Sequence, residues 1–586
     1  MHCHIAKQPI PPHELNLEVP PIISAIVLKL MAKNAEERYL SAYKLKADLQ
    51  ECLRQWQSKD RIDPFPIDRH NISDRFQIPQ KLYGREREIS VLLAAFDRVS
   101  QGASEMMLVS GYSGMGKTVL IQEIYKPLTR QRGYFIAGKF DQFQRDTPYA
   151  SLIQAFRSLV RQLLTESDTQ ISKWREKLQA ELGEASGVIV QVIPEVELII
   201  GSQPPLPDLP PAEQRNRFNR VLQKFINIFT QPEHPLVIFL DDLQWADRAS
   251  LELIQLWMTV ADNKYLFLIG AYRDNEVSEA HPLIQILENI AKAKVTTINK
   301  IFLTPLTLTD ITQILVDTLF VASKYDQLLA KLLQQKTGGN PFSINEILKT
   351  LHSEGWFNFN YGSHQRQWDF KQIKAQPLTD NVLDITNKNV KKLPTATQAV
   401  LKLAACVGNQ FDLRTLAIIY EKSLQETATD LRVALQSGLI VPLSRDYQLA
   451  ELDVEGLSQR LVAEYKFAHD RIQQAVYSLI SEADRQSVHL RVGRLLLENT
   501  PSEELAQKLF DIVNQLNKGR ALIDRRIERY ELARLNLQTA KKAKSSAASQ
   551  PAFIVVSNKN ETLSCTISAN NLIKRCGSIR IHYSSL

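Results

Sequence analysis

Between about residues 78 and 304, short apolar runs alternate with stretches of helical periodicity. The runs are strand-sized and apolar throughout, at residues 106–110, 134–137, 236–240 and 266–270. Continuous apolar strands separated by helices are typical of a parallel sheet covered by helices on both faces. The pattern therefore predicts an α/β domain, interrupted by a segment rich in proline and charge over residues 196–217.

The regions on either side follow helical patterns. Apolar positions predict helices near residues 22–31 and 45–56. Residues 390–445 read as helix, turn and helix, with a short strand at 438–442, which is compatible with a winged-helix domain. We expect a helical N-terminal part at 1–56, a linker at 57–77, the α/β domain at 78–304, a helical lid at 305–350, a winged-helix-like domain at 351–450, a helical repeat-like region at 451–545, and an atypical tail without helical period at 546–586, for which disorder is one reading.

The composition is that of a globular protein. Of 586 residues, 44% are hydrophobic and 23% are charged, which excludes a collagen, a wholly disordered chain and a small disulfide scaffold. No apolar run approaches the roughly 18 residues of a membrane helix, and the N-terminus lacks the pattern of a signal peptide, so the cytoplasm is expected. The five cysteines are far apart and indicate neither a zinc site nor a disulfide framework.

The net charge is concentrated in one segment. Lysine and arginine outnumber the acids by 71 to 64, which gives +7, and residues 541–586 alone carry +6 of it. The rest of the chain is nearly neutral, whereas a duplex-binding domain is usually clearly basic. Nucleic acid is therefore not expected as a partner, although a steeply salt-dependent affinity for DNA would reopen that reading.

A phosphate-binding motif follows the first predicted strand. The motif G-x-x-x-x-G-K-[ST] is formed by Gly111, Tyr112, Ser113, Gly114, Met115, Gly116, Lys117 and Thr118. It lies between a predicted strand and a predicted helix, which is the context it requires. Backbone amides and the helix N-terminus bind phosphate, Lys117 reaches the β and γ oxygens, and the Thr118 hydroxyl ligates Mg²⁺. We therefore expect a nucleotide and Mg²⁺ as cofactors.

Two acids end the predicted strand at residues 236–240. The carboxyl edge of a parallel sheet brings such residues beside the phosphate loop. Asp241 is the expected Mg²⁺ partner, and Asp242 is positioned to orient or polarise the attacking water. A helix cap is the structural alternative. Arg273, at the end of the next strand, either points its guanidinium at the γ-phosphate or pairs with Asp274 or Glu276 in its own loop.

Three other features have structural readings from the residues alone. Trp245 is expected to be a core anchor, and Gly338-Gly339-Asn340-Pro341-Phe342 is expected to be a turn between two helices. His469-Asp470, near a predicted helix start, suggests a cap or a buried hydrogen bond. Neighbouring residues on a helix point in different directions, so this pair makes no catalytic triad.

The order of these motifs resembles a known family. Residues 83–86 (YGRE), 111–118 (GYSGMGKT), 236–247 (LVIFLDDLQWAD), 270–276 (GAYRDNE) and 338–342 (GGNPF) look like the signal-transduction ATPases with numerous domains. The version resembles the origin-recognition-like AAA ATPase module of large bacterial hybrid proteins, which combine a serine/threonine kinase with sensor and histidine-kinase domains. The resemblance covers about residues 1–545.

The resemblance implies roles for several residues. It supports Asp241 as the metal acid and Asp242 as the water-polarising acid, and it implies that Arg273 is the sensor of the γ-phosphate. It also implies that Gly339 and Pro341 contact the bound nucleotide, which it identifies as ATP; the residues alone leave ATP and GTP open. Gly84 and Arg85 are weaker candidates near the adenine.

The two ends of the chain depart from the family. Residues 1–56 resemble only the last helices of a protein-kinase C-lobe, with Lys33–Tyr39 similar to its closing motif. The Gly-rich loop, strand lysine, catalytic loop and magnesium site of a kinase have no counterpart, so kinase activity is not expected from this chain. Residues 546–586 resemble nothing in the family, and we interpret the chain as truncated at both ends.

We therefore expect an α/β P-loop ATPase of the signalling type, with helical and winged-helix regions after it. ATP·Mg²⁺ binding and slow hydrolysis would switch the packing of these regions on the nucleotide domain. Protein partners in signalling are expected. The alternatives are a scaffold that binds nucleotide without turnover and a truncated gene product without function.

Overall fold

Five parallel strands form the central sheet, in the order β2-β3-β4-β1-β5. The strands are β1 (Ser104–Ser110), β2 (Tyr134–Lys139), β3 (Leu236–Asp241), β4 (Leu266–Tyr272) and β5 (Thr297–Phe302). The first four contain the apolar runs seen in the sequence, which confirms the α/β P-loop-type fold expected there. The computed structural model describes residues 9–545 except 17, 33–37, 40–41, 68–75, 77, 80, 143–147, 205, 208, 320–323, 361–364, 369, 376–381 and 444–462.

The fifth strand was not predicted from the sequence. β5 is an edge strand that pairs only with β1, and Ile301 is its one buried residue. Its polar residues, including Asn299 and Lys300, remain accessible because an edge strand needs less apolar surface than a central one. The strand therefore lacks the continuous apolar run by which the other four were recognised.

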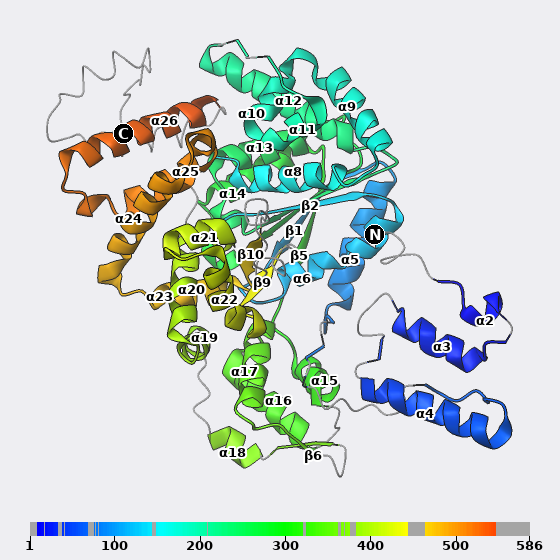
Figure 1. Cartoon of the computed structure of the whole chain (residues 1–586). Coiled ribbons are helices and arrows are strands. Elements are labelled where there is room, and N and C mark those ends of the chain that lie inside the picture. Colours follow the sequence, from blue (N-terminus) through cyan, green and yellow to red (C-terminus); the bar gives the residue numbers. More distant parts are fainter. Residues whose placement is uncertain are drawn as a thin grey trace.

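Helices cover both faces of the sheet, as expected for a parallel sheet (Figure 1). One face packs against α5 (Glu86–Ser100), α6 (Lys117–Gln122) and α7 (Tyr125–Arg130). The other packs against α8 (Ala150–Leu163), α12 (Pro211–Phe229), α13 (Arg248–Thr259) and α14 (Pro282–Ala293). The core of this face extends outward to α9 (Asp168–Leu182), α10 (Ser186–Val192) and α11 (Glu197–Ile200). The segment at residues 196–217, expected as an interruption, thus contains α11, the loop after it and the start of α12.

A helical lid follows the sheet domain. It contains α15 (Leu308–Leu319), α16 (Lys324–Thr337) and α17 (Pro341–Ser353). The hairpin of β6 (Asn358–Asn360) and β7 (Gln365–Gln367) and the helix α18 (Phe370–Ala375) come next. Phe357 and Ile373 are buried in the same core as the lid helices. The lid therefore continues beyond residue 350, where the sequence placed its end.

A second, smaller sheet lies in what we call the three-stranded unit, the described residues of 395–478. Its antiparallel strands run β8 (Gln410–Asp412), β10 (Glu464–Phe467) and β9 (Ile440–Pro442) in spatial order. The sheet packs with α20 (Thr395–Val407), α21 (Leu413–Tyr420), α22 (Leu424–Gln436) and α23 (Asp470–Ser478), while α19 (Val382–Lys391) precedes them. β10 lies beyond residue 450, so this sheet takes a strand from the region expected to be purely helical.

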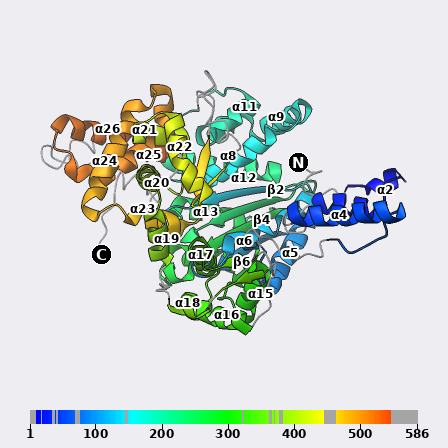
Figure 2. The same ribbon diagram turned by 60° about the horizontal axis from the view of Figure 1, so that its bottom comes forward.

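The outermost elements are helical. The three-stranded unit shares its core with α24 (Glu482–Asn499), α25 (Ser502–Lys518) and α26 (Arg526–Ser545), which are grouped beside it in Figures 1 and 2. Near the N-terminus, α2 (Pro12–Leu15), α3 (Pro21–Leu30) and α4 (Ala42–Lys59) lie to one side of the sheet domain in both views. The tail 546–586 and most of the motif 33–39 fall outside the described residues. Among the described helices, none is both long and apolar enough to cross a bilayer.

Candidate functional site

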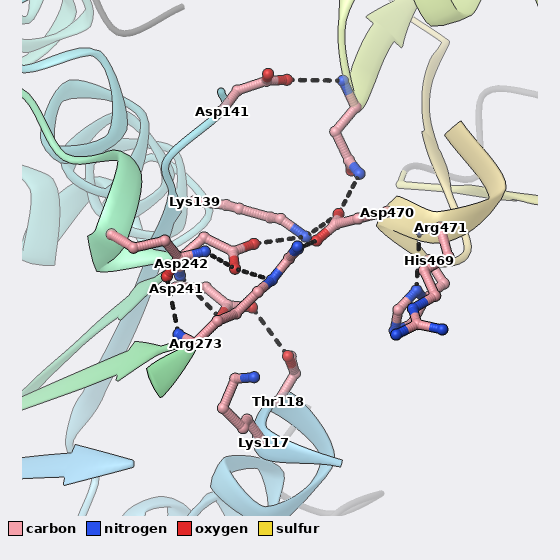
Figure 3. A network of polar contacts seen from close by, with 12 residues as sticks. Lys117, Thr118, Lys139, Asp141, Asp241, Asp242, Arg273, His469, Asp470 and Arg471 are labelled. Carbon is pink, nitrogen blue, oxygen red and sulfur yellow. Dashed lines mark hydrogen bonds and ion pairs between the residues drawn. The ribbon is translucent and has the colours of Figure 1, made fainter. Parts of the chain in front are cut away.

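The carboxyl edge of the large sheet gathers the polar residues of the candidate site (Figure 3). Along this edge lie Lys139 at the end of β2, Asp241 at the end of β3, and Arg273 just after β4. β1, which leads into the phosphate loop, is the next strand after β4. Parallel pairing puts all these strand ends at one edge, so the residues meet although they are far apart in the sequence.

The phosphate loop is a tight turn that leads into α6. Gly111, Gly114 and Gly116 have φ values of 147°, 85° and 90°, a region that side chains disfavour. Lys117 folds back over the loop, and its Nζ donates hydrogen bonds to the carbonyl oxygens of Gly111, at 2.8 Å, and Tyr112, at 3.1 Å. Burial lowers the pKa of Lys117, although the nearby acids oppose this shift. The lysine thus lies in the loop that it is expected to serve.

The other residues of the loop have distinct environments. Met115 is buried in the core beneath α5, whereas the Tyr112 side chain is half exposed at 50%. The carbonyl oxygen of Ser113 accepts a hydrogen bond from Asn340 of the lid. Met115 thus anchors the loop to the sheet domain, and Ser113 connects it to the lid.

Thr118 and Asp241 come together as the sequence predicts for metal ligands. Thr118 Oγ1 donates a hydrogen bond of 2.9 Å to Oδ2 of Asp241. The other Asp241 oxygen, Oδ1, accepts the backbone N–H of Asp242 at 3.0 Å. A hydroxyl and a carboxylate are hard oxygen ligands of the kind that Mg²⁺ prefers beside phosphates. These two residues therefore fit the expected metal.

Asp242 has an unusual backbone and an unusual environment. Its φ of 57° is left-handed, which turns its side chain from β3 into the site. Gln244 Nε2 donates to its Oδ1 at 2.8 Å. Burial, together with the negative charges of Asp241 and Asp470, raises the pKa of Asp242 to about 7. A carboxyl with a pKa near neutrality is suited to accept a proton or to orient a water molecule.

Arg273 pairs within its own loop, as one of the two readings predicts, and contact with a γ-phosphate, the other reading, stays a prediction. Its Nη1 pairs with Glu276 of its own loop at 2.9 Å, and its Nε lies 3.3 Å from Oδ1 of Asp242. Its guanidinium also lies over the ring of Trp245, 4.5 Å from the centroid. Trp245 is itself buried in the core, as predicted. The remaining guanidinium nitrogen, Nη2, donates to Oδ2 of Asp470 at 2.8 Å.

Asp470 and Lys139 are functional candidates that the sequence analysis missed. Asp470 begins α23 of the three-stranded unit, and its Oδ1 pairs with Lys139. Lys139 also lies 3.4 Å from Oδ2 of Asp242, and Asn409 donates to Asp470 at 2.7 Å. Burial alone would raise the pKa of Asp470, but Lys139 holds it well below its usual range. The only sequence signal was an acid at a predicted helix start, which is common in caps.

His469 has the capping role that the sequence suggested. Its Nδ1 accepts the backbone N–H of Arg471 at 3.1 Å, at the start of α23. Its ring stacks on Phe342, with centroids 4.0 Å apart. Burial lowers the pKa of His469 to about 3, so the ring is neutral at pH 7. The stacked rings bring the start of α23 into contact with α17 of the lid.

The glycine-rich turn of the lid packs on the phosphate loop. Asn340 Nδ2 donates to the Ser113 carbonyl oxygen at 2.8 Å, and the Phe342 N–H donates to that of Gly114 at 3.2 Å. The flanking Gly339 accepts a hydrogen bond from the Leu306 N–H at 2.9 Å, and Pro341 begins α17. The segment is more than a turn, because it joins the lid to the loop. A nucleotide contact by Gly339 or Pro341 stays a prediction, as does one by Gly84 or Arg85.

Part of this site lies in a segment that matches a known family. Residues 81–269, about a third of the chain, match the family model of the AAA ATPase domain. The phosphate loop, Asp241 and Asp242 lie within the matched residues, whereas Arg273 and the lid lie beyond them. A protein described as a signal transduction ATPase with numerous domains, with a tetratricopeptide repeat sensor, from Pyrococcus horikoshii aligns at a TM-score of 0.39, with 12% identity over 86% of this chain and 60% of its own.

Curated relatives of the chain are eukaryotic histidine kinases. Hybrid signal transduction histidine kinase G of Dictyostelium discoideum is 29% identical over an alignment 666 positions long. The alignment covers 94% of this chain and 19% of that protein. Histidine protein kinase 1 of Candida albicans is 20% identical, covering 86% of this chain and 24% of its own length. The chain spans about a fifth to a quarter of these relatives, and the expected link to bacterial serine/threonine kinases stays a prediction. The chain therefore has an AAA ATPase domain over residues 81–269 and is similar to a region of hybrid signal-transduction kinases.

Proposed function

We propose that the chain is an ATP-binding signal-transduction ATPase that acts as a nucleotide-dependent switch. One observation carries the proposal: Asp470, from the three-stranded unit, reaches into the phosphate site and pairs with both Lys139 and Arg273. A carboxylate there takes up the cations that a triphosphate would also attract. The Asp470 carboxylate and the triphosphate therefore compete for the same cations.

The residues of the sheet edge would divide the work as follows. The loop amides and Lys117 bind the phosphates, and Thr118 and Asp241 hold Mg²⁺. When bound there, Mg²⁺ would supply positive charge to offset that of the phosphates. Asp242, held by Gln244, orients the attacking water. Hydrolysis is expected to be slow, because in the docked arrangement Arg273 is occupied by acids of the protein.

The switch follows from the two arrangements available to Arg273. Without a γ-phosphate, Arg273 pairs with Asp470 and helps to hold the three-stranded unit against the sheet domain. With a γ-phosphate, the same guanidinium has a more highly charged partner, and its contact with Asp470 weakens. A bistable contact of this kind converts a phosphate into a domain movement. The similarity to hybrid signal-transduction kinases supports a signalling role. Protein partners and a cytoplasmic location are part of the same proposal.

Nucleotide binding and phosphate release test the proposal. The wild-type protein is expected to bind ATP with Mg²⁺, and Lys117→Ala is expected to abolish binding. Lys126→Ala, which removes an exposed lysine of the neighbouring α7, is the matched control and should bind normally. Unchanged affinity in Lys117→Ala would show that the site is wrongly assigned.

A second measurement separates an ATPase from a scaffold that binds ATP without turnover. Phosphate release by the wild type should exceed that of Asp242→Asn, which keeps the shape of the side chain but lacks its charge. Equal rates at the background level would favour the scaffold. If ATP then stabilised both the wild type and Asp242→Asn, nucleotide binding alone would set the switch.

A further inference from the structure

We propose that Arg471 of α23 is a second phosphate-binding arginine, whose guanidinium pairs with a terminal phosphate oxygen of a bound nucleoside triphosphate. The inference rests on the proposed function and deepens it, because it assigns a nucleotide contact to the three-stranded unit itself. Of the neighbouring residues Asp470 and Arg471, Asp470 would contact the site when it holds no phosphate, and Arg471 would contact the phosphate when one is bound.

The first support is that the Arg471 guanidinium has no acceptor among the described residues. No hydrogen bond or ion pair joins its guanidinium to any residue that the structure describes, and its side chain is partly buried. Burial and the positive charge of Arg273 both lower its pKa, and no nearby acid opposes them. A partly buried guanidinium beside another guanidinium is unfavourable unless an anion lies between or near them. A phosphate group supplies such an anion.

The second support is the position of α23. His469 stacks on Phe342, and the Phe342 N–H donates to the Gly114 carbonyl oxygen in the phosphate loop. A single residue, Phe342, therefore separates the start of α23 from the phosphate loop. Figure 3 shows the Arg471 side chain beside His469, directed away from the Asp470 carboxylate.

The different directions of the two side chains explain how both can serve one site. Successive residues of a helix are about 100° apart around its axis, so Asp470 can pair with Arg273 while Arg471 stays free. When a γ-phosphate takes Arg273, Asp470 loses one partner, and Arg471 gains one. The planar guanidinium matches phosphate oxygens with two parallel hydrogen bonds. The start of α23 would then exchange its acid for its base at the same anion.

The test compares a triphosphate with a diphosphate. Titration calorimetry with Mg²⁺ measures the Kd of the non-hydrolysable ATP analogue adenylyl imidodiphosphate and of ADP for Arg471→Gln, which keeps most of the side-chain stem. We expect the Kd of the analogue to rise about tenfold or more, as for loss of a charge-assisted hydrogen bond, and that of ADP to change less than about twofold. Arg471→Lys should recover part of the lost affinity. Arg494→Ala removes an arginine that pairs with Glu528 away from the site and should change neither Kd.

The outcomes separate this inference from the proposed function. If the wild type binds both nucleotides and Arg471→Gln binds them as the wild type does, or loses both equally, Arg471 is no phosphate ligand and the proposed function stands. If the wild type binds neither nucleotide, both are overturned. If Arg471→Gln does not fold, Arg471→Lys replaces it, and an unchanged ratio of the two Kd values in that variant overturns the inference.

Discussion

Arg273 and Asp470 are 197 residues apart in the chain, yet Nη2 of one lies 2.8 Å from Oδ2 of the other. Both side chains are nearly excluded from solvent, at 6% and 11% exposure. One belongs to the edge of the large sheet and the other to the first turn of α23. This buried pair, reinforced by Lys139, ties the three-stranded unit to the phosphate site.

Loss of the Asp470 charge should loosen the switch. In Asp470→Asn, Arg273 and Lys139 each lose one of the carboxylates that hold them, so both become more available to phosphate. We expect phosphate release and the exchange of bound ADP to be about threefold to tenfold faster, a difference of about 1 kcal/mol in the barrier. A fluorescent ADP analogue reports the exchange rate.

The matched control lies in the same unit. Asp430→Asn breaks an ion pair with Lys422 at the surface and should leave both rates unchanged. An Asp470→Asn protein with wild-type rates would contradict the competition between docking and triphosphate binding.

Removal of Lys139 should destabilise the contact between the domains. Lys139→Met removes one of the two cations that the buried Asp242 and Asp470 share, and breaking a buried ion pair in this way costs about 3–5 kcal/mol. Urea unfolding followed by tryptophan fluorescence measures the change. Lys422→Met, which removes the cation of a surface pair, should have no measurable effect, and equal midpoints for the two variants would contradict the prediction.

The contact between the lid and the phosphate loop can be tested at Gly114. A Cβ atom at this residue would lie 2.6 Å from Oδ1 of Asn340 and 2.9 Å from Cβ of Phe342. Gly114→Ala should therefore push the lid away and weaken ATP binding about tenfold or more. Gly183→Ala is the matched control, because its φ of 55° imposes similar backbone strain while its Cβ meets open space. If both variants bind ATP equally, lid contact is unimportant for the site.

A buried histidine in the C-terminal helices should make stability depend on pH. His489 lies between Tyr477 and Gln515, and burial lowers its pKa to about 4. The unfolded chain, with a pKa near 6.5, binds more protons between these values. Stability is therefore retained above about pH 6.5 and lost as the pH falls towards 4, by on the order of 2 kcal/mol.

A variant isolates that contribution. His489→Gln keeps a hydrogen-bonding side chain that does not titrate, so the difference in unfolding free energy between wild type and variant should itself change between pH 7 and pH 4.5. Urea titrations at both values measure it. A difference that is the same at both pH values would assign the acid sensitivity to other groups.

Local chemistry in the sequence was sufficient for much of the sheet domain. Four strands are recognisable as continuous apolar runs because helices cover both faces of the sheet. The edge strand β5 has one buried residue and lacks such a run. The phosphate-loop motif and Asp241 could be recognised because each directly follows or ends a strand that is visible in the sequence. The lid turn was visible as a motif, but its hydrogen bonds to Ser113 and Gly114 were not.

What the sequence determined by itself was the parallel sheet, the phosphate-loop motif and the acids at the end of β3, because each depends on a short run of neighbouring residues. Only the tertiary structure decided that Asp470 pairs with Arg273 and Lys139, that β10 completes the smaller sheet, and that Arg471 is left without an acceptor among the described residues. Asp470 lies 197 positions from Arg273 and 331 from Lys139, and β10 pairs with two strands that lie elsewhere in the three-stranded unit. Charged side chains pair with particular partners only when packing excludes water from between them and fixes their orientations.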